Sequence, residues 1–510
     1  MQHELNRSDI CRIRRFAIQA VVALSVASVC WAFSSPPLST PDEILHIANI
    51  WCAEESDGGA CISKERGSNG EVIGTFGYAP ESCFWRQGAI PANCSSSENG
   101  QHSFLLLQEG SYYESGFQRV MHRFVGGNGS LSVLRMKMFN ALLFVAIVAY
   151  LMLFAPTKIS RSWLAATAVT VAPLSIWLIT SINPSSWGIM GLAALWPYAI
   201  WFVSQRFDKS HLVDGTFVRL VTPLLLALLI FLATQSRSDV KLFTVVVLAT
   251  LAAFEFANRK VRILSQRAKR FTLVGLITFA TMLVLLALTR GFLGYRFRTE
   301  LAPLNPDGPS VRVWFTNWLT HFPAVFLDAY GKSGLGENEI AIPELAAISS
   351  VLVLGGVIFF ASTRGSLMQL TSAVFLGLAF VAILWFASIE LDLYNVPGRY
   401  VMPLFPVIVG TYIYYSQSAL QLFDILRLRQ IAIGLLGVAN ALGLYAVVER
   451  YSAGSSAGLR VIPVRFDEWW WDFLPIGPNA VVILGSVSWV VFLVYAFRFL
   501  DERKLREAAS

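Results

Sequence analysis

The chain has 510 residues, of which 55% are hydrophobic and only 14% are charged, and its mean hydropathy is +0.56. A water-soluble fold of this composition would leave a large apolar area exposed, so the sequence predicts an integral membrane protein. The net charge of +7 does not indicate nucleic acid, because the basic residues lie between hydrophobic runs, where they act as topology signals.

The first element is an apolar run over residues 16–33, preceded by an N-terminus, residues 1–15, that carries four arginines. This pattern predicts an uncleaved signal anchor that begins in the cytoplasm. Eleven further apolar runs are each long enough to cross about 30 Å of hydrocarbon as a helix, and their all-round apolarity excludes a β-barrel. They lie at 138–156, 163–181, 187–204, 217–234, 240–257, 271–290, 345–362, 368–387, 403–418, 431–447 and 479–498.

The sequence therefore predicts an all-α integral membrane protein with about twelve transmembrane helices. Helices two to seven fill residues 138–290, helices eight to twelve fill residues 345–498, and residues 499–510 are a cytoplasmic tail. This alternation places the basic connections and both termini in the cytoplasm. It assigns four extracytoplasmic segments, at 35–134, 291–344, 388–402 and 448–478.

Four of the six cysteines fall in the large first outer loop: Cys52, Cys61, Cys83 and Cys94. An even number of cysteines outside the cytoplasm predicts two disulfides. Four cysteines allow three connectivities, of which Cys52–Cys61 with Cys83–Cys94 closes short local loops. A zinc site is the alternative, and the lack of a C-x-x-C spacing weighs against it.

A short helix is predicted just after the first span, in the segment TPDEILH at residues 40–46. Thr40 as N-cap, Pro41 at the first helical position and Glu43 three residues after the cap form a capping box. This helix would lie at the membrane surface.

On that helix Asp42, His46 and Asn49 would point the same way, because they are four and seven residues apart. Two interpretations stay open for the acids. Asp42 and Glu43 either complement the positive end of the helix, or one of them is a general base that deprotonates an acceptor hydroxyl at the bilayer edge. In the second case His46 would orient the base or help to hold a divalent cation, Mg²⁺ or Mn²⁺. No metal ligand set is predicted.

Two other segments carry charge at predicted outer turns. Arg237, Asp239 and Lys241 lie between two apolar spans. They are either a cluster of ion pairs that ends the two helices or a binding site for an anion. Arg399 follows a Pro-Gly turn and precedes Tyr400. Its guanidinium suits a phosphate clamped by two parallel hydrogen bonds, and snorkelling to lipid headgroups is the alternative.

The remaining outer turns give weaker signals. Trp469, Trp470 and Trp471 are predicted to join an interfacial aromatic belt, with a sugar-stacking platform as the alternative. Asn183 and Pro184 predict mainly the end of a helix.

The segments TPDEILH at 40–46 and GRYVMP at 398–403 together resemble a bacterial family of polytopic membrane proteins, domain-of-unknown-function family 2142. The resemblance covers about residues 15–450 and includes a charged turn with a lysine near Lys241. That family looks like a branch of the GT-C glycosyltransferase superfamily, which is associated with surface polysaccharides. The cysteine-bearing loop 35–134 departs from the family pattern, and this leaves the choice of acceptor open.

The resemblance implies an inverting GT-C-like glycosyltransferase in the bacterial inner membrane. It would move a sugar from a polyprenyl-phosphate donor to a cell-envelope glycan or lipid on the extracytoplasmic face. Asp42 or Glu43 would be the base, and Arg399 would stabilise the leaving phosphate, supported by Arg237 and Lys241.

Two alternatives remain open. The first is a carrier or flippase of a lipid-linked sugar, and the second is a ligase or polymerase that uses a diphosphate-linked donor. Ionisable residues at helix ends, rather than near the bilayer midplane, favour interfacial chemistry over transport.

Overall fold

The structure is a computed structural model, and it describes most of the chain. The described residues are 7–53, 61–66, 72–79, 83–84, 87, 89–94, 100–106, 115–171, 173–207, 216–260, 340, 343–363, 400–416, 420–454, 469–471 and 475–509. The predicted spans 271–290 and 368–387 lie outside these residues, as do nearly all of the predicted loop 291–344 and residue 399.

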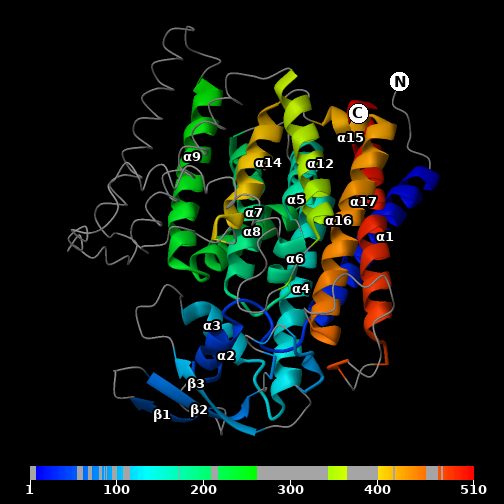
Figure 1. Cartoon of the computed structure of the whole chain (residues 1–510). Coiled ribbons are helices and arrows are strands. Elements are labelled where there is room, and N and C mark those ends of the chain that lie inside the picture. Colours follow the sequence, from blue (N-terminus) through cyan, green and yellow to red (C-terminus); the bar gives the residue numbers. More distant parts are fainter. Residues whose placement is uncertain are drawn as a thin grey trace, which may run out of the picture.

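The described chain is a bundle of helices with a small sheet at one end (Figure 1). The N-terminal end of α1 and the C-terminal end of α17 lie together at the opposite end (Figure 1). We call these the sheet end and the terminal end. The bundle elements are α1 (Arg7–Phe33), α4 (Gly129–Phe154), α5 (Thr157–Thr170), α6 (Pro173–Ile179), α7 (Ser185–Phe207), α8 (Thr216–Thr234), α9 (Ser238–Lys260), α12 (Glu344–Thr363), η5 (Met402–Leu404), α14 (Phe405–Tyr415), α15 (Gln421–Asp424), α16 (Leu426–Ala453) and α17 (Pro478–Ala509).

Five of these helices are long and apolar enough to cross a membrane. Their membrane-length parts are Arg14–Phe33, Gly129–Phe154, Ser185–Val203, Leu426–Ala453 and Pro478–Asp501. Large apolar side chains point outward from the bundle, among them Leu224 on α8 and Phe359 on α12, which are 69% and 66% exposed. Such exposure fits lipid rather than water as the surrounding solvent. Transmembrane helices are thus confirmed, while the count of about twelve remains a prediction.

One predicted span is broken. Residues 163–181 are not one straight helix, because α5 and α6 are bent by 102° relative to each other, around residue 172, which lies outside the described residues. Pro173 begins α6, and a proline has no N–H to continue α5 and disfavours helical backbone in the residue before it. Every residue of both helices except Lys158 is buried, so the break is surrounded by protein, where irregular backbone at membrane depth is tolerated.

Helix ends also differ from the prediction. α1 begins at Arg7 and α17 runs to Ala509, so the predicted terminal tails continue the helices. α4 begins at Gly129, inside the predicted loop, because the side chain of Asn128 caps it by accepting a hydrogen bond from the backbone N–H of Leu131. Lys137 therefore lies inside α4.

The described part of the predicted first outer loop includes a sheet, which corrects the all-α expectation. It contains α2 (Glu43–Trp51), β1 (Cys61–Arg66), β2 (Val72–Ala79), η1 (Ala92–Cys94), β3 (Gly100–Leu106) and α3 (Ser115–His122). The strands form one antiparallel sheet in the order β1-β2-β3, in which Thr75 of β2 pairs with both neighbours. Polar, glycine-rich strands lack the alternation that would have predicted them. α2 packs on this sheet and on α3.

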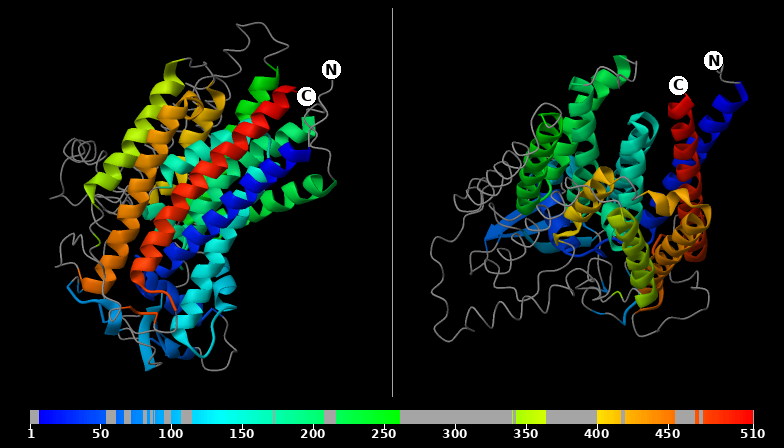
Figure 2. Two further views of the ribbon diagram at one scale, coloured as in Figure 1. Left: turned by 90° about the vertical axis from the view of Figure 1, so that its right-hand side faces the viewer. Right: turned by 90° about the horizontal axis from the view of Figure 1, so that it is seen from above.

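At the terminal end, charged side chains join four helices. Arg161 of α5 contacts Asp424 of α15, and its Nη2 lies 3.3 Å from Oδ1 of Asp501 on α17. Arg429 of α16 contacts the other oxygen of Asp501. Arg161 is 4% exposed. α1 and α17 lie side by side along the bundle (Figure 2).

Candidate functional site

The segment between α1 and α2, residues 34–42, is called the strap here. It crosses the sheet end of the bundle, and every residue from 34 to 41 is buried. A buried segment without helical or strand hydrogen bonds must have its carbonyl groups satisfied by side chains. The contacts of the strap therefore show what positions the predicted acids.

Lys137 of α4 holds the beginning of the strap. Its Nζ donates to the carbonyl oxygens of Ser35 and Pro36, at 2.9 and 3.0 Å, and to Oγ of Ser35 at 3.1 Å. Lys137 is fully buried. An ammonium group has three N–H donors, so these contacts use all of them.

Two other side chains hold the rest of the strap. The hydroxyl of Tyr451, in the last turn of α16, donates to the carbonyl oxygen of Ser39 at 2.6 Å. Nδ2 of Asn183, in the turn between α6 and α7, donates to the carbonyl oxygen of Pro41, also at 2.6 Å. Three separate parts of the bundle thus fix this one segment.

The strap is strained as well as buried. Leu38 and Asp42 have φ angles of 65° and 59°, and they are the non-glycine residues with positive φ in the described chain. Such backbone costs about 1–3 kcal/mol per residue and persists only where the surroundings over-determine it. Strain of this kind clusters at functional sites.

Glu43 ties the end of the strap to α2. Its Oε2 accepts hydrogen bonds from the backbone N–H and from Oγ1 of Thr40, both at 2.6 Å. Glu43 is fully buried, and its Oε1 has no hydrogen-bond partner among the described residues. The predicted capping box is therefore only half right. Because the Thr40 hydroxyl donates to the carboxylate instead of accepting from the helix, α2 begins at Glu43 and not at Pro41.

Asp42 is consequently the N-cap of α2, and its side chain makes no capping hydrogen bond. Its left-handed backbone puts it outside the helix, so the helical i, i+4 spacing on which the sequence prediction for Asp42 and His46 rested does not apply to this pair. His46 is instead buried with Glu43. Asp42 is half-buried, and it is the more accessible acid of the pair.

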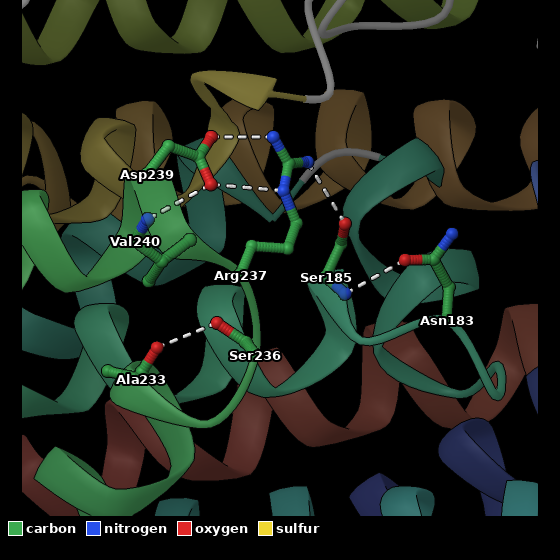
Figure 3. Close-up of polar contacts among 7 residues, drawn as sticks. All are labelled: Asn183, Ser185, Ala233, Ser236, Arg237, Asp239 and Val240. Atoms are coloured by element: carbon green, nitrogen blue, oxygen red, sulfur yellow. Dashed lines mark hydrogen bonds and ion pairs between the residues drawn. The ribbon is translucent and has the colours of Figure 1, made fainter. Parts of the chain in front are cut away.

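Arg237 is the centre of a second cluster, at the turn between α8 and α9 (Figure 3). Its Nε and Nη2 donate to the two carboxylate oxygens of Asp239 at 3.1 and 2.5 Å. Its Nη1 donates to Oγ of Ser185, the first residue of α7, at 3.3 Å. Its guanidinium carbon lies 3.9 Å from the ring centre of Tyr400. Lys241 lies in the first turn of α9, where its backbone N–H donates to the carbonyl oxygen of Arg237.

Asn183 connects this cluster to the strap. While its Nδ2 holds Pro41, its Oδ1 accepts from the backbone N–H of Ser185 at 2.8 Å, and Ser185 in turn contacts Arg237 (Figure 3). The ring of Tyr400 packs against the guanidinium group of Arg237 and is the last contact of this series. The three polar segments singled out in the sequence therefore meet at one place, although Arg399 itself lies outside the described residues.

Sequence reasoning missed three of the residues that build this site. Asn183 was interpreted as a helix stop, and Lys137 and Tyr451 were not singled out. A lysine among apolar residues was the available signal for Lys137, because a charge inside a membrane span is expensive unless it is paired. Nothing local marks the other two, since their partners are distant in sequence.

The tryptophan prediction needs correction. Trp470 and Trp471 are 6% and 0% exposed, and Nε1 of Trp471 donates to the carbonyl oxygen of Phe33 at 2.9 Å. Side chains packed against protein in this way do not face lipid headgroups, so these two do not form an interfacial belt.

The cysteine prediction stays open as to pairing. No disulfide joins two of the described side chains, but Cys52 and Cys83 are each disulfide-bonded. The side chains of Cys61 and Cys94 lie outside the description. Among the described residues, no three His, Cys, Asp or Glu side chains form a group that could hold a metal ion.

Comparison with known families decides the relationship. The sequence matches the family described as "Predicted membrane protein (DUF2142)" over residues 26–408. The chain belongs to this family. The matched region begins in α1 and includes the strap, the Arg237 cluster and Tyr400. No curated protein and no solved structure shows a significant match to the chain.

Proposed function

We propose that this member of the family is a membrane glycosyltransferase with a GT-C-like mechanism. It moves a sugar from a polyprenyl-phosphate donor to a cell-envelope glycan or lipid. The sheet end is the catalytic end and faces outward from the bacterial inner membrane, with both termini in the cytoplasm. A monophosphate donor is the simplest choice, and a diphosphate-linked donor uses the same site.

One observation carries the proposal. A continuous series of contacts, Pro41–Asn183–Ser185–Arg237–Tyr400, joins the acids beside α1 to a turn that bears two cations and to the segment that follows Arg399. A carboxylate for the acceptor and positive charge for the leaving group are the two components that transfer from a sugar phosphate requires.

Each residue has a distinct role. Asp42 takes the proton of the acceptor hydroxyl as that oxygen bonds to the anomeric carbon. The bond from this carbon to the phosphate oxygen breaks, and the electron pair leaves with the polyprenyl phosphate. Arg399, Arg237 and Lys241 stabilise the negative charge that develops there. Glu43 is bonded to Thr40 and fully buried, so it shapes the strap instead of meeting the acceptor.

The test is complementation of a deletion strain with the wild type, Asp42→Asn or Glu344→Gln. Glu344 is the matched control, because it is an exposed acid in the first turn of a helix away from the strap. Lipid-linked sugars and envelope glycans are measured by mass spectrometry, and protein abundance by immunoblot. We expect Asp42→Asn to reduce transfer by about 10²-fold or more, the contribution of a general base, with accumulation of the charged donor.

Other outcomes would refute this assignment. Normal transfer by Asp42→Asn at normal abundance removes Asp42 as the base. If the deletion leaves the charged donor on the cytoplasmic face, and purified protein moves that donor across vesicles without forming a glycosidic product, the protein is a carrier.

A further inference from the structure

A fully buried lysine and a fully buried glutamate lie at opposite ends of the strap, yet they form no ion pair in the described structure. Lys137 donates its three hydrogen bonds to Ser35 and Pro36, and one carboxylate oxygen of Glu43 accepts from Thr40. Both are nevertheless fully buried against the same nine-residue segment, where the low dielectric strengthens the attraction between opposite charges. Neither side chain serves the proposed chemistry directly.

We propose that Lys137 is a positioning residue, which holds the strained strap so that Asp42 is presented to the acceptor, and that Glu43 is its charge partner across the strap. The catalytic part of this inference rests on the proposed function. The structural part, that these two charges fix the strap, does not.

Charge balance explains why both residues are needed. An isolated buried charge is costly, and removing one member of a buried pair leaves the other uncompensated, which is strongly destabilising. Replacing both by neutral groups of similar volume is far better tolerated. Lys137→Met and Glu43→Gln are suitable changes, since each keeps most of the side-chain volume.

Hydrogen bonding explains why charge balance alone is insufficient. Lys137 donates to two strap carbonyl groups for which the described residues provide no other donor, and Leu38, with its positive φ, lies two residues after Pro36. Without these bonds the strap is free to relax its strain. A displacement of about 1 Å at a catalytic group is enough to reduce a rate by about 10²-fold.

The experiment compares Lys137→Met, Glu43→Gln and the double variant in the full-length protein in membranes. Abundance reports the charge balance, and glycan transfer per molecule reports the site. A reporter cysteine, Ser39→Cys, reports the strap by its labelling with a membrane-impermeant maleimide. Ser39 is fully buried. The same protein without Ser39→Cys gives the background labelling.

We expect each single variant to lose at least about 10-fold in abundance, and the double variant to recover most of it. In the double variant the reporter becomes labelled at least several-fold faster, and transfer per molecule stays reduced by about 10²-fold. A purely structural role does not predict this separation of abundance from transfer.

Two results would overturn the inference. If the double variant recovers transfer together with abundance, Lys137 only balances charge. If the reporter stays protected in the double variant, the strap does not depend on Lys137. Failure of the proposed function is recognised separately, because normal transfer by Asp42→Asn would leave the abundance and labelling results intact.

Discussion

Asn183 links the strap to the Arg237 cluster. Replacing it with leucine tests whether this link is needed for glycan transfer. The side chain is 1% exposed, and Asn183→Leu keeps its approximate shape while removing two hydrogen bonds. The carbonyl oxygen of Pro41 and the backbone N–H of Ser185 lose their partner. An orphaned buried polar group costs about 1–3 kcal/mol, so the variant should lose about 2–6 kcal/mol of stability.

Asn140→Leu is the matched control. Asn140 is also buried, its Nδ2 donates to the carbonyl oxygen of Ser181 at 2.6 Å and more weakly to Oγ of Ser186 at 3.4 Å, and its Oδ1 accepts from Nε1 of Trp187 at 3.0 Å. The substitution again orphans one carbonyl group and one N–H donor, and we expect a similar loss of stability. Asn140, however, makes no contact with the strap in the described structure.

The assay is glycan transfer per molecule of membrane-inserted protein, together with the thermal unfolding midpoint in detergent. We expect Asn183→Leu to lose about 10²-fold in transfer, because the end of the strap that carries Asp42 is released. Asn140→Leu should stay within about three-fold of the wild type, a difference of less than 1 kcal/mol in the barrier. An equal loss of transfer in both variants, at equal stability, would refute the positioning argument.

Three further predictions concern the scaffold. In Gly191→Ala the new Cβ lies 2.8 Å from the backbone nitrogen of Ala233 on α8, and we expect a loss of about 1–3 kcal/mol in thermal stability. Gly355→Ala, whose Cβ meets nothing within 4 Å, should instead gain about 0.5–1 kcal/mol, and equal shifts would contradict the close packing. Arg161→Met removes one cation from Asp424 and Asp501, of which Asp501 keeps Arg429, and membrane abundance should fall as for a loss of about 1–3 kcal/mol. Mass spectrometry of non-reduced digests should recover Cys52 and Cys83 in two separate disulfides, and recovery of either as a free thiol would be inconsistent with the structure.

The helices were predictable where length and apolarity decide the outcome. α1, α16 and α17 follow from apolar runs that only a lipid environment accommodates. The break between α5 and α6 was not predicted, because hydropathy averages over Pro173 and does not register a change of direction. The sheet was not predicted because its strands lack a regular alternation of apolar and polar residues.

The site was predictable in its parts but not in its assembly. Asp42, Glu43 and Arg237 were identified because they lie next to apolar runs. A charge close to hydrocarbon is energetically costly, so its presence there indicates pairing or function. Their meeting place depends on Asn183 and Tyr451, which bond to carbonyl groups more than 140 and 400 positions away in the sequence. Main-chain acceptors are identical in every residue, so a sequence carries no mark of which carbonyl group a distant side chain will contact.

The two ends of the bundle differ in how their charged groups are paired and in backbone strain, and this difference bears on the choice between enzyme and carrier. At the terminal end, Arg161 has two carboxylate partners, so its charge is matched within the protein. At the sheet end, the strap holds two positive-φ residues, and Glu43 has a buried oxygen without a hydrogen-bond partner. A carrier would need comparable polar sites near the middle of the membrane, reached in turn from both ends. In the described chain, the two positive-φ residues and the Glu43 carboxylate, which is bonded through one oxygen, instead lie beside Asp42, at one end only, as expected for a fixed site where chemistry is done at the membrane surface.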